Sequence, residues 1–295
     1  MHFLVSFRFR SSYSRVLHNE ANRNRDTRAL RLDQIMTHSS LSFLNFGTAS
    51  AERAIAVRRD LGTNPGLFWL GGFKSDMQGT KAAALSDWAR QQGRACVRFD
   101  YSGHGESGGD FADGTIGRWL EESLAVFESN CAGPQVAIGS SMGGWIALLL
   151  ARELRRRKAE GKPVAASLAG LVLIAPAVDF TEALMWRGFP AKVRREIEEK
   201  GVWHRPSDYG EPYPITRGLI EEGRRHLLLG AMIETGCPVR ILQGVQDPDV
   251  PWNHAVELTS RLAQDDVVLT LVKDGDHRLS RTEDIARLIE AVREF

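Results

Sequence analysis

Three side chains in this sequence, a serine, an aspartate and a histidine, have the types and the chain order needed for nucleophilic attack on a carbonyl carbon. A serine hydroxyl is a weak nucleophile at neutral pH, so it needs a base to take its proton and an acid to orient that base. Ser141 is the candidate nucleophile, Asp247 the candidate acid and His277 the candidate base. Each role requires the residue to follow a buried strand, because binding groups gather at the carboxyl ends of parallel strands.

Ser141 lies at the centre of a G-x-S-x-G pattern that runs from Gly139 to Gly143. An apolar strand, Gln135 to Ile138, precedes the pattern, and a helix beginning at Met142 follows it. This context predicts a nucleophile elbow, in which glycines are needed because larger side chains would collide with neighbouring backbone. The elbow exposes the serine hydroxyl and directs the helix N-terminus at the carbonyl under attack. The competing interpretation is a glycine- and serine-rich turn without chemistry.

The candidate acid lies in a loop that follows a predicted strand, Val239 to Leu242. This loop holds two aspartates, Asp247 and Asp249. An aspartate here could also cap the helix that starts near Trp252, and Asp249 suits that capping role better. We therefore expect Asp247 to orient the base, with Asp249 as the alternative.

The candidate base, His277, follows the last predicted strand, Val267 to Val272, and precedes the last helix. This is the position that the order serine, acid, histidine requires. The other histidines lie in the N-terminal region, in an early loop, in a long insertion or at a helix start: His2, His18, His38, His104, His204, His226 and His254.

Two backbone N–H groups are expected to stabilise the oxyanion that forms during attack. One is the Met142 N–H at the start of the elbow helix. The second should come from the loop after the predicted strand Leu67 to Leu70, where Gly71 and Gly72 allow close backbone approach. We expect the Phe73 N–H to be this second donor, although a plain turn would also explain the two glycines.

Strands and helices alternate along most of the chain, which predicts a mostly parallel sheet with helices on both faces. Residues 62–66 are expected to form a turn. Residues 179 to about 235 interrupt the alternation and are predicted to be a small helical cap insertion, with Trp186, Trp203, Tyr209 and Tyr213 in its loops. The predicted strands are Leu41–Phe46, Ala54–Arg58, Leu67–Leu70, Ala95–Phe99, Gln135–Ile138, Leu168–Ala175, Val239–Leu242 and Val267–Val272; the predicted helices are Thr80–Gln92, Gly117–Asn130, Trp145–Leu154, Lys192–Lys200, Trp252–Leu262 and Thr282–Phe295.

The overall composition excludes several classes of protein. The 295 residues carry 38 Lys and Arg against 37 Asp and Glu, and this balance argues against nucleic acid as a partner. The three cysteines, Cys96, Cys131 and Cys237, form neither a disulfide framework nor a metal-ligand spacing, which fits a reducing compartment. The longest apolar run, Leu168 to Val178, is too short for a transmembrane segment.

Residues 1–36 differ from the rest of the chain because they are rich in Arg and Ser and poor in acidic residues. They are excluded from the predicted domain, which spans residues 39–295. The composition resembles a mitochondrial transit peptide. A disordered extension, or a true start at Met36, is the favoured explanation, so we expect a cytoplasmic location, with mitochondria as the alternative.

Together these motifs resemble the α/β-hydrolase-fold serine hydrolases, and more narrowly the mitochondrial palmitoyl-protein thioesterase and acyl-glucuronide esterase subfamily. The resemblance covers residues 65 to 285 and implies that Ser141 is the nucleophile, Asp247 the acid and His277 the base. The subfamily usually has His-Gly where this chain has Gly71-Gly72. The carrying stretches are Gly72–Lys81, Arg98–Gly103, Gly139–Trp145, Gly201–Trp203, Asp247–Trp252 and Asp276–Arg278.

The predicted reaction is transfer of an acyl group to Ser141 and then to water, with no metal or cofactor. The expected substrate is a small-molecule or protein-linked acyl ester or thioester, and the aromatic insertion either forms an acyl pocket or only packs over the sheet. An aminopeptidase-like or lipase-like hydrolase with the same residues is the alternative. A non-catalytic hydrolase-fold binding module is a further one, which the presence of all three side chains disfavours.

Overall fold

The computed structural model describes residues 39–47, 52–162, 165–207, 210–262 and 266–295. The extension predicted over residues 1–36 lies outside these residues. Among the described residues, no helix has the length and apolar character needed to cross a bilayer.

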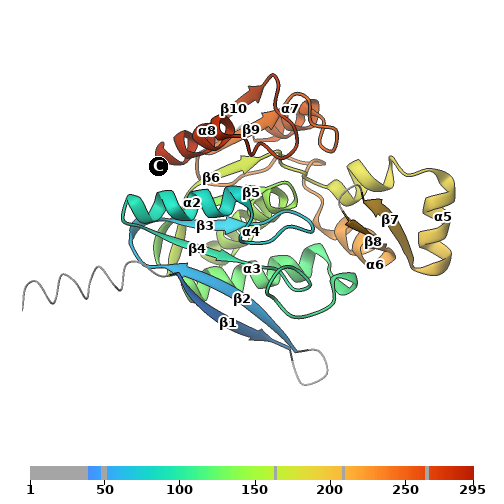
Figure 1. Cartoon of the computed structure of the whole chain (residues 1–295), viewed down its shortest axis with the longest axis horizontal. Coiled ribbons are helices and arrows are strands. Elements are labelled where there is room, and N and C mark those ends of the chain that lie inside the picture. The colour runs from blue at the N-terminus through green and yellow to red at the C-terminus, as the bar shows by residue number, and fades with distance from the viewer. Residues whose placement is uncertain (1–38, 48–51, 163–164, 208–209, 263–265) are drawn as a thin grey trace, which may run out of the picture. The chain divides into compact units, whose positions relative to one another are not determined.

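The centre of the fold is an eight-stranded sheet with the order β1-β2-β4-β3-β5-β6-β9-β10 (Figure 1). Strands β1 and β2 pair antiparallel, and β2 pairs antiparallel with β4, whereas all other neighbours are parallel. The predicted mostly parallel sheet is therefore confirmed. The strands are β1 (Ser40–Phe46), β2 (Arg53–Asp60), β3 (Thr63–Leu70), β4 (Arg94–Phe99), β5 (Gly133–Ser140), β6 (Ala166–Ile174), β9 (Val239–Gly244) and β10 (Val267–Val272).

The parallel strands are held in a register that brings their carboxyl ends to one edge of the sheet. One row across the sheet contains Phe68, Ala137, Leu171, Val239 and Val267, each opposite the next. The last residues of the central strands are buried on both faces, as expected for a sheet covered on both sides. Loops that follow β3, β5, β9 and β10 therefore meet at the same edge.

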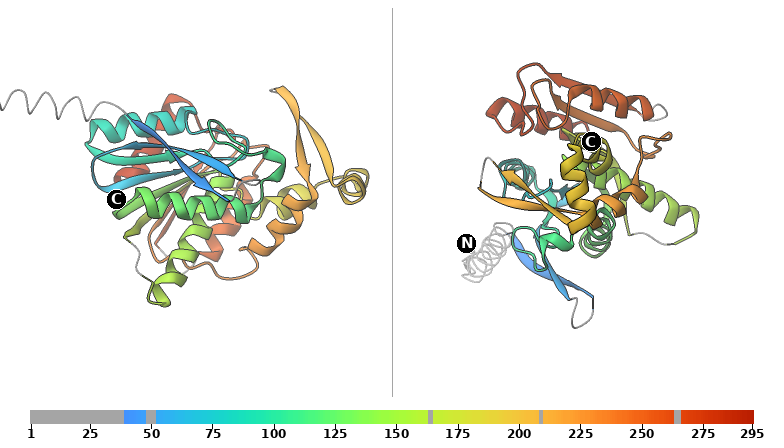
Figure 2. Two further views of the ribbon diagram at one scale, coloured as in Figure 1. Left: turned by 90° about the horizontal axis from the view of Figure 1, so that it is seen from below. Right: turned by 90° about the vertical axis from the view of Figure 1, so that its right-hand side faces the viewer.

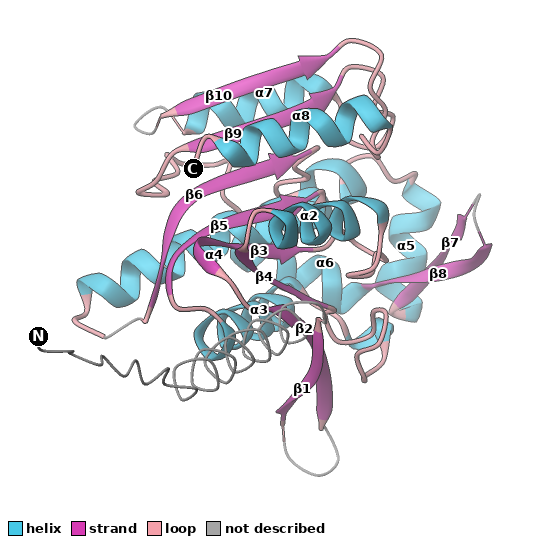
Figure 3. Cartoon of the chain, turned by 60° about the vertical axis from the view of Figure 1, so that its left-hand side comes forward, coloured by secondary structure: helices cyan, strands magenta, loops and turns pink. Residues whose placement is uncertain are grey.

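Helices cover both faces of the sheet (Figures 1 and 3). Helices α2 (Thr80–Gln91) and α8 (Thr282–Arg293) contribute Leu85 and Leu288 to a core with Val136 of β5. Helices α3 (Ile116–Asn130), α4 (Met142–Ala159) and α7 (Trp252–Arg261) pack on the other face, where Phe127 and Leu148 meet Phe68 of β3. Each of the six parallel strands supplies side chains to both cores because its residues alternate between the two faces.

The segment between β6 and β9 contains a second, two-stranded sheet in addition to helices. Its elements are η3 (Thr181–Trp186), α5 (Ala191–Lys200), β7 (Val202–Ser207), β8 (Gly210–Thr216), α6 (Arg217–Gly223) and η4 (Arg224–His226). Helix α5 and the β7–β8 hairpin project away from the main sheet, on the side where the parallel strands end (Figures 1 and 2).

Both ends of this segment meet at one carboxylate. Asp179, just after β6, accepts the Leu228 N–H at 2.9 Å and the Leu229 N–H at 2.9 Å. The Asp179 side chain is buried, and its residue adopts a left-handed backbone conformation with φ 56°. The chain thus leaves and re-enters the main body at adjacent points.

The structure corrects two local predictions. Residues 63–66 are not a turn: β3 begins at Thr63, because Thr63 pairs with Arg94 and Gly66 with Gln135. The prediction that the insertion aromatics lie in loops is also wrong. Trp186 is in η3, Trp203 in β7 and Tyr213 in β8, while Tyr209 lies outside the described residues. Both strands contain proline, which is unfavourable within sheets, so the sequence does not indicate a hairpin here. Proline is tolerated in this exposed two-stranded ribbon because both of its strands are edge strands.

Candidate active site

Three loops at the carboxyl edge of the sheet bring Ser141, Asp247 and His277 into one hydrogen-bonded chain. The His277 Nε2 lies 3.1 Å from the Ser141 Oγ, and the His277 Nδ1 lies 2.8 Å from the Asp247 Oδ2. A carboxylate only accepts hydrogen bonds, so Nδ1 carries the proton and Nε2 offers its lone pair to the serine hydroxyl. This tautomer is the one that can remove a proton from Ser141.

Ser141 occupies the sharp turn between β5 and α4 that the glycine pattern predicts. Its backbone has φ 54° and ψ −116°, outside the regions that L-residues ordinarily adopt. A Cβ at Gly139 would lie 2.3 Å from the Gly143 carbonyl oxygen, and a Cβ at Gly143 would lie 2.1 Å from the Leu70 carbonyl oxygen. Both positions therefore exclude any residue but glycine while this turn is kept.

The Asp247 carboxylate is held by donors on both of its oxygens. Its Oδ1 accepts the Asp249 N–H and the Val250 N–H, each at 2.8 Å, and its Oδ2 accepts the Gln243 Nε2 at 3.1 Å as well as His277. The side chain is completely buried. Because charge-assisted bonds from fixed donors define its position, the carboxylate is rigidly aimed at the imidazole.

Asp249, the alternative acid, is exposed and contributes its backbone N–H to Asp247 rather than its carboxylate to His277. Ligand atoms of Asp247, Asp249 and His277 do lie within 4.8 Å of one another, a spacing that could suit a metal ion. Both nitrogens of His277 are already bonded to Ser141 and Asp247, however, so a metal here would replace the hydrogen-bonded chain rather than assist it.

The loop after β3 approaches the nucleophile closely through glycine. A Cβ at Gly72 would lie 3.5 Å from the Ser141 Cβ and 3.3 Å from the Ser140 carbonyl oxygen. Within the described ranges, neither the Phe73 N–H nor the Met142 N–H donates a hydrogen bond to a protein acceptor. The two predicted oxyanion donors thus belong to backbone that flanks Ser141, and both remain available to a ligand.

Comparison with known proteins places this chain in a family. A model of the alpha/beta hydrolase family matches residues 62–291. The chain belongs to the alpha/beta hydrolase family. The resemblance inferred from the motifs extends to the subfamily, because the human mitochondrial palmitoyl-protein thioesterase ABHD10 is 35% identical over 256 residues, covering 86% of this chain and 79% of the relative.

Two solved structures agree with this assignment. A putative hydrolase from Agrobacterium vitis is 47% identical with a TM-score of 0.81, and it covers 87% of this chain and 98% of its own. Mouse alpha/beta hydrolase domain-containing protein 10 is 35% identical with a TM-score of 0.75, with the same coverage. Est1E from Butyrivibrio proteoclasticus, at 20% identity and a TM-score of 0.66 over 85% of this chain and 97% of its own, shares the fold.

Aromatic rings surround Phe73 in this hydrolase. The Phe73 ring centroid lies 4.9 Å from Phe111, 5.9 Å from Trp119, 5.6 Å from Phe180 and 6.0 Å from Tyr213. These rings come from the 3-10 helix η2 (Phe111–Asp113), from α3 and from the segment between β6 and β9. The insertion and the main body therefore share one apolar cluster beside the predicted oxyanion donor.

A lysine that sequence reasoning missed supports the His277 loop. The Lys81 Nζ, from α2, donates to the Arg278 carbonyl oxygen, one residue after His277. Burial, followed by the nearby Arg278 charge, lowers the pKa of Lys81 from 10.5 to about 8. The contact joins residues 197 positions apart, so no local pattern in the sequence could have signalled it.

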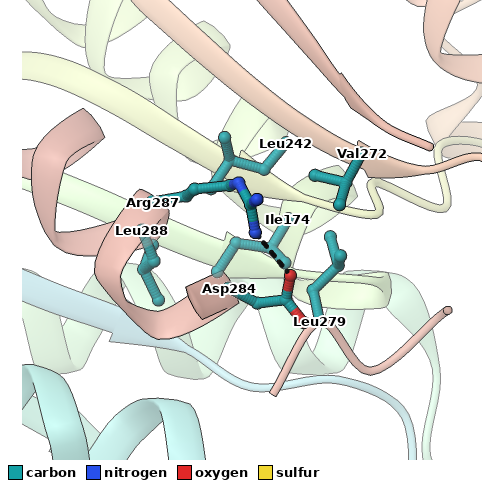
Figure 4. Close-up of a pocket in the computed structure, with 7 residues that line it drawn as sticks. All are labelled: Ile174, Leu242, Val272, Leu279, Asp284, Arg287 and Leu288. Carbon is teal, nitrogen blue, oxygen red and sulfur yellow. Dashed lines mark hydrogen bonds and ion pairs between the residues drawn. The ribbon is translucent and has the colours of Figure 1, made fainter. Parts of the chain in front are cut away.

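The first turn of α8 fixes the other side of the same loop. The Asp284 carboxylate accepts Arg281 Nε at 2.8 Å and Arg287 Nη1 at 3.1 Å, while Arg281 also reaches Asp274 at 2.7 Å. Leu279 points into an apolar hollow between α8 and the ends of the strands, where Arg287 extends toward Asp284 (Figure 4). The strand that precedes His277 and the helix that follows it are therefore linked to each other by side chains.

Proposed function

We propose that this hydrolase cleaves carboxylic esters or thioesters through an acyl-enzyme formed on Ser141, with His277 as base and Asp247 as the acid that orients it. The observation that supports this most strongly is the unbroken chain of hydrogen bonds from Asp247 through His277 to Ser141. A serine with such a base and orienting acid has the arrangement needed for covalent catalysis.

In the proposed mechanism, His277 Nε2 takes the Ser141 proton while the serine oxygen attacks the acyl carbon. The Phe73 and Met142 N–H groups stabilise the negative charge that develops on the carbonyl oxygen. The buried Asp247 carboxylate stabilises the imidazolium, which then protonates the leaving alcohol or thiol. Water attacks the acyl-enzyme in the second half, with His277 again as base, and the free acid leaves.

An apolar acyl group is the favoured substrate portion because aromatic rings gather beside the proposed oxyanion donors. Phe73 and Phe180 pack at 5.6 Å, and Phe180 also packs on Trp145 of α4 at 5.7 Å. Burying an alkyl chain against such rings contributes about 0.8 kcal/mol per methylene. The relatives named as palmitoyl-protein thioesterases support a long-chain acyl thioester as the substrate class.

Fluorophosphonate labelling tests the proposed function directly. The probe should label Ser141, the Ser141→Ala variant should be folded but unlabelled, and excess palmitoyl thioester should slow labelling of the original protein. Labelling that the thioester does not slow would keep the serine hydrolase and exclude the long-chain acyl pocket. Labelling of a folded Ser141→Ala variant at an equal rate would refute the assignment of the nucleophile.

A panel of acyl esters, acyl thioesters and aminoacyl anilides separates the proposal from its alternatives. Faster turnover of the anilides would favour an aminopeptidase-like enzyme, and turnover only of emulsified triglycerides would favour a lipase-like one. A folded protein that binds acyl compounds without turning over any of them would be a binding module.

The names of the animal relatives include a mitochondrial location, and for this chain we propose the mitochondrial alternative over the cytoplasmic one. The Arg- and Ser-rich composition of residues 1–36 supports it. Import of the full chain, tagged at its C-terminus, into isolated mitochondria with removal of N-terminal residues is the expected result. Exclusion from the organelle would return the assignment to the cytoplasm.

A further inference from the structure

A buried histidine outside the proposed catalytic residues contacts the loop that carries Phe73. His104 lies in the loop after β4 and is only 4% exposed. Its ring packs against three aromatic rings, with centroids 5.7 Å from Tyr101, 5.1 Å from Phe111 and 5.3 Å from Trp119. A polar ring is expensive to bury in such surroundings unless its nitrogens are hydrogen-bonded.

Both ring nitrogens of His104 are bonded to backbone groups, and these bonds fix its tautomer. The Nδ1 lies 3.1 Å from the Ser102 carbonyl oxygen, and the Nε2 receives the Lys74 N–H at 3.1 Å. A carbonyl only accepts and an N–H only donates, so Nδ1 carries the proton and Nε2 carries the lone pair. An imidazolium could not accept the Lys74 N–H. Burial lowers the pKa of His104 to about 4, so the neutral ring is the form present at neutral pH.

The Lys74 N–H belongs to the central peptide of a tight turn. The Ser75 N–H donates to the Gly72 carbonyl oxygen at 3.1 Å, which closes a four-residue turn around Phe73 and Lys74. Lys74 has φ 58°, a left-handed conformation that costs a non-glycine residue about 1 kcal/mol or more. Rotation of the central peptide would release this strain but would point the Lys74 N–H away from His104.

A second contact holds the end of the same loop at a separate point. The Asp100 Oδ1 accepts the Met77 N–H at 2.6 Å, and Arg98 Nη1 donates to the Met77 carbonyl oxygen at 3.0 Å. These contacts fix residue 77, two positions beyond the turn, but they do not determine the orientation of the peptide between Phe73 and Lys74. Among the hydrogen bonds of the described residues, the acceptor that determines that orientation is His104.

We propose that His104 is a positioning residue, which holds the turn from Gly72 to Ser75 in the shape that directs the Phe73 N–H at the oxyanion. This inference rests on the proposed function, because it assigns to Phe73 the role of an oxyanion donor. The neutral imidazole offers an acceptor at a fixed point behind the turn, and the aromatic rings around it prevent its rotation.

Two variants of His104 separate hydrogen bonding from packing. His104→Phe keeps a ring of similar size but has no acceptor for the Lys74 N–H. His104→Gln places an amide oxygen near the position of Nε2 and can accept the same N–H. His254→Phe is a matched control, because His254 is also buried and its Nε2 lies 2.9 Å from the Val178 carbonyl oxygen. This hydrogen bond does not involve the turn from Gly72 to Ser75.

The assay is steady-state hydrolysis of p-nitrophenyl butyrate, with fluorophosphonate labelling rates and melting temperatures for each variant. Removal of a complete oxyanion donor costs about 10²- to 10³-fold in kcat, so a donor that is present but misdirected should cost about 10- to 100-fold. We expect His104→Phe to lower kcat and the labelling rate by this factor with KM changed less than about 3-fold. His104→Gln should retain kcat within about 5-fold, and His254→Phe should lower the melting temperature more than kcat.

Equal kcat values for His104→Phe and the original protein would overturn the proposal, and so would equal losses in the Phe and Gln variants. If His104→Phe does not fold, His104→Met carries the same prediction, because it fills the site without a strong acceptor. Ser141→Ala in the same assay tests the proposed function separately. Loss of activity in Ser141→Ala with full activity in His104→Phe would reject the positioning role alone.

Discussion

Replacement of Asp247 by asparagine should cost this hydrolase almost all of its activity while leaving its fold intact. The asparagine carbonyl can still accept the N–H groups of Asp249 and Val250, so the loop keeps two of its bonds. Its NH₂ group then occupies the Oδ2 position and donates to His277 Nδ1, which must give up its own proton. The imidazole proton moves to Nε2 and points at Ser141, so the ring can no longer act as a base.

The size of the effect follows from the tautomer. An equivalent change in a serine protease lowers kcat about 10⁴-fold, which corresponds to about 5.5 kcal/mol of transition-state stabilisation. The NH₂ group also faces the Gln243 Nε2 at 3.1 Å, donor against donor, which adds a small loss of stability. We expect kcat/KM for p-nitrophenyl butyrate at pH 7.5 to fall about 10⁴-fold, with a melting temperature within a few degrees.

Asp249→Asn is the matched control. It changes the exposed neighbouring carboxylate but keeps the backbone N–H that Asp247 accepts. We expect its kcat/KM to stay within about 5-fold of the original. If Asp247→Asn keeps more than about a tenth of the activity, or if Asp249→Asn loses as much as Asp247→Asn, Asp247 does not orient the base.

Three further predictions concern the surroundings of the site. Lys81 has a lowered pKa in the folded state, so the unfolded chain binds more protons between about pH 8 and 10.5. This residue therefore makes the free energy of unfolding rise with pH over that window. Denaturant unfolding at pH 8 and pH 10 should show a smaller rise in the free energy of unfolding for Lys81→Met than for the original protein. Gly72→Ala should slow fluorophosphonate labelling at least 10-fold because its methyl group would lie 3.3 Å from the Ser140 carbonyl oxygen, tight against the backbone that carries the nucleophile. Gly71→Ala, whose methyl group would meet nothing nearer than 3.8 Å, should stay within about 2-fold, and equal rates for the two variants would contradict the close approach. Phe180→Ala should raise KM for a palmitoyl thioester about 10-fold and for an acetyl thioester less than 3-fold, and a uniform change would place the acyl chain elsewhere.

The three proposed catalytic side chains could be found from the sequence because parallel strands bring the residues that follow them to one edge. Ser141, Asp247 and His277 each follow an apolar strand, so their meeting required only the order of the strands and not the details of packing. The choice between Asp247 and Asp249 is different. Both follow the same strand, and only the direction of their side chains separates them.

The supporting contacts could not be predicted because they depend on distant residues or on loop shape. His104 lies in an early loop, and nothing nearby in the sequence shows that its ring receives the Lys74 N–H. The β7–β8 hairpin is not predictable from the sequence for another reason. Its prolines are a local signal against strands, and its pairing with itself outside the main sheet makes them tolerable.

Both ends of the insertion meet at Asp179, so the segment from residue 180 to 227, called the cassette below, can be exchanged as a unit. Residues 180–227 leave and return beside one carboxylate, which bonds the backbone of Leu228 and Leu229 whatever side chains those residues carry. Deletions, extensions and exchanges within the cassette therefore need not move the strands that carry Ser141, Asp247 and His277. An engineer could therefore graft the segment from one relative to another, provided that the rings of Phe180 and Tyr213, which pack on Phe73, are kept.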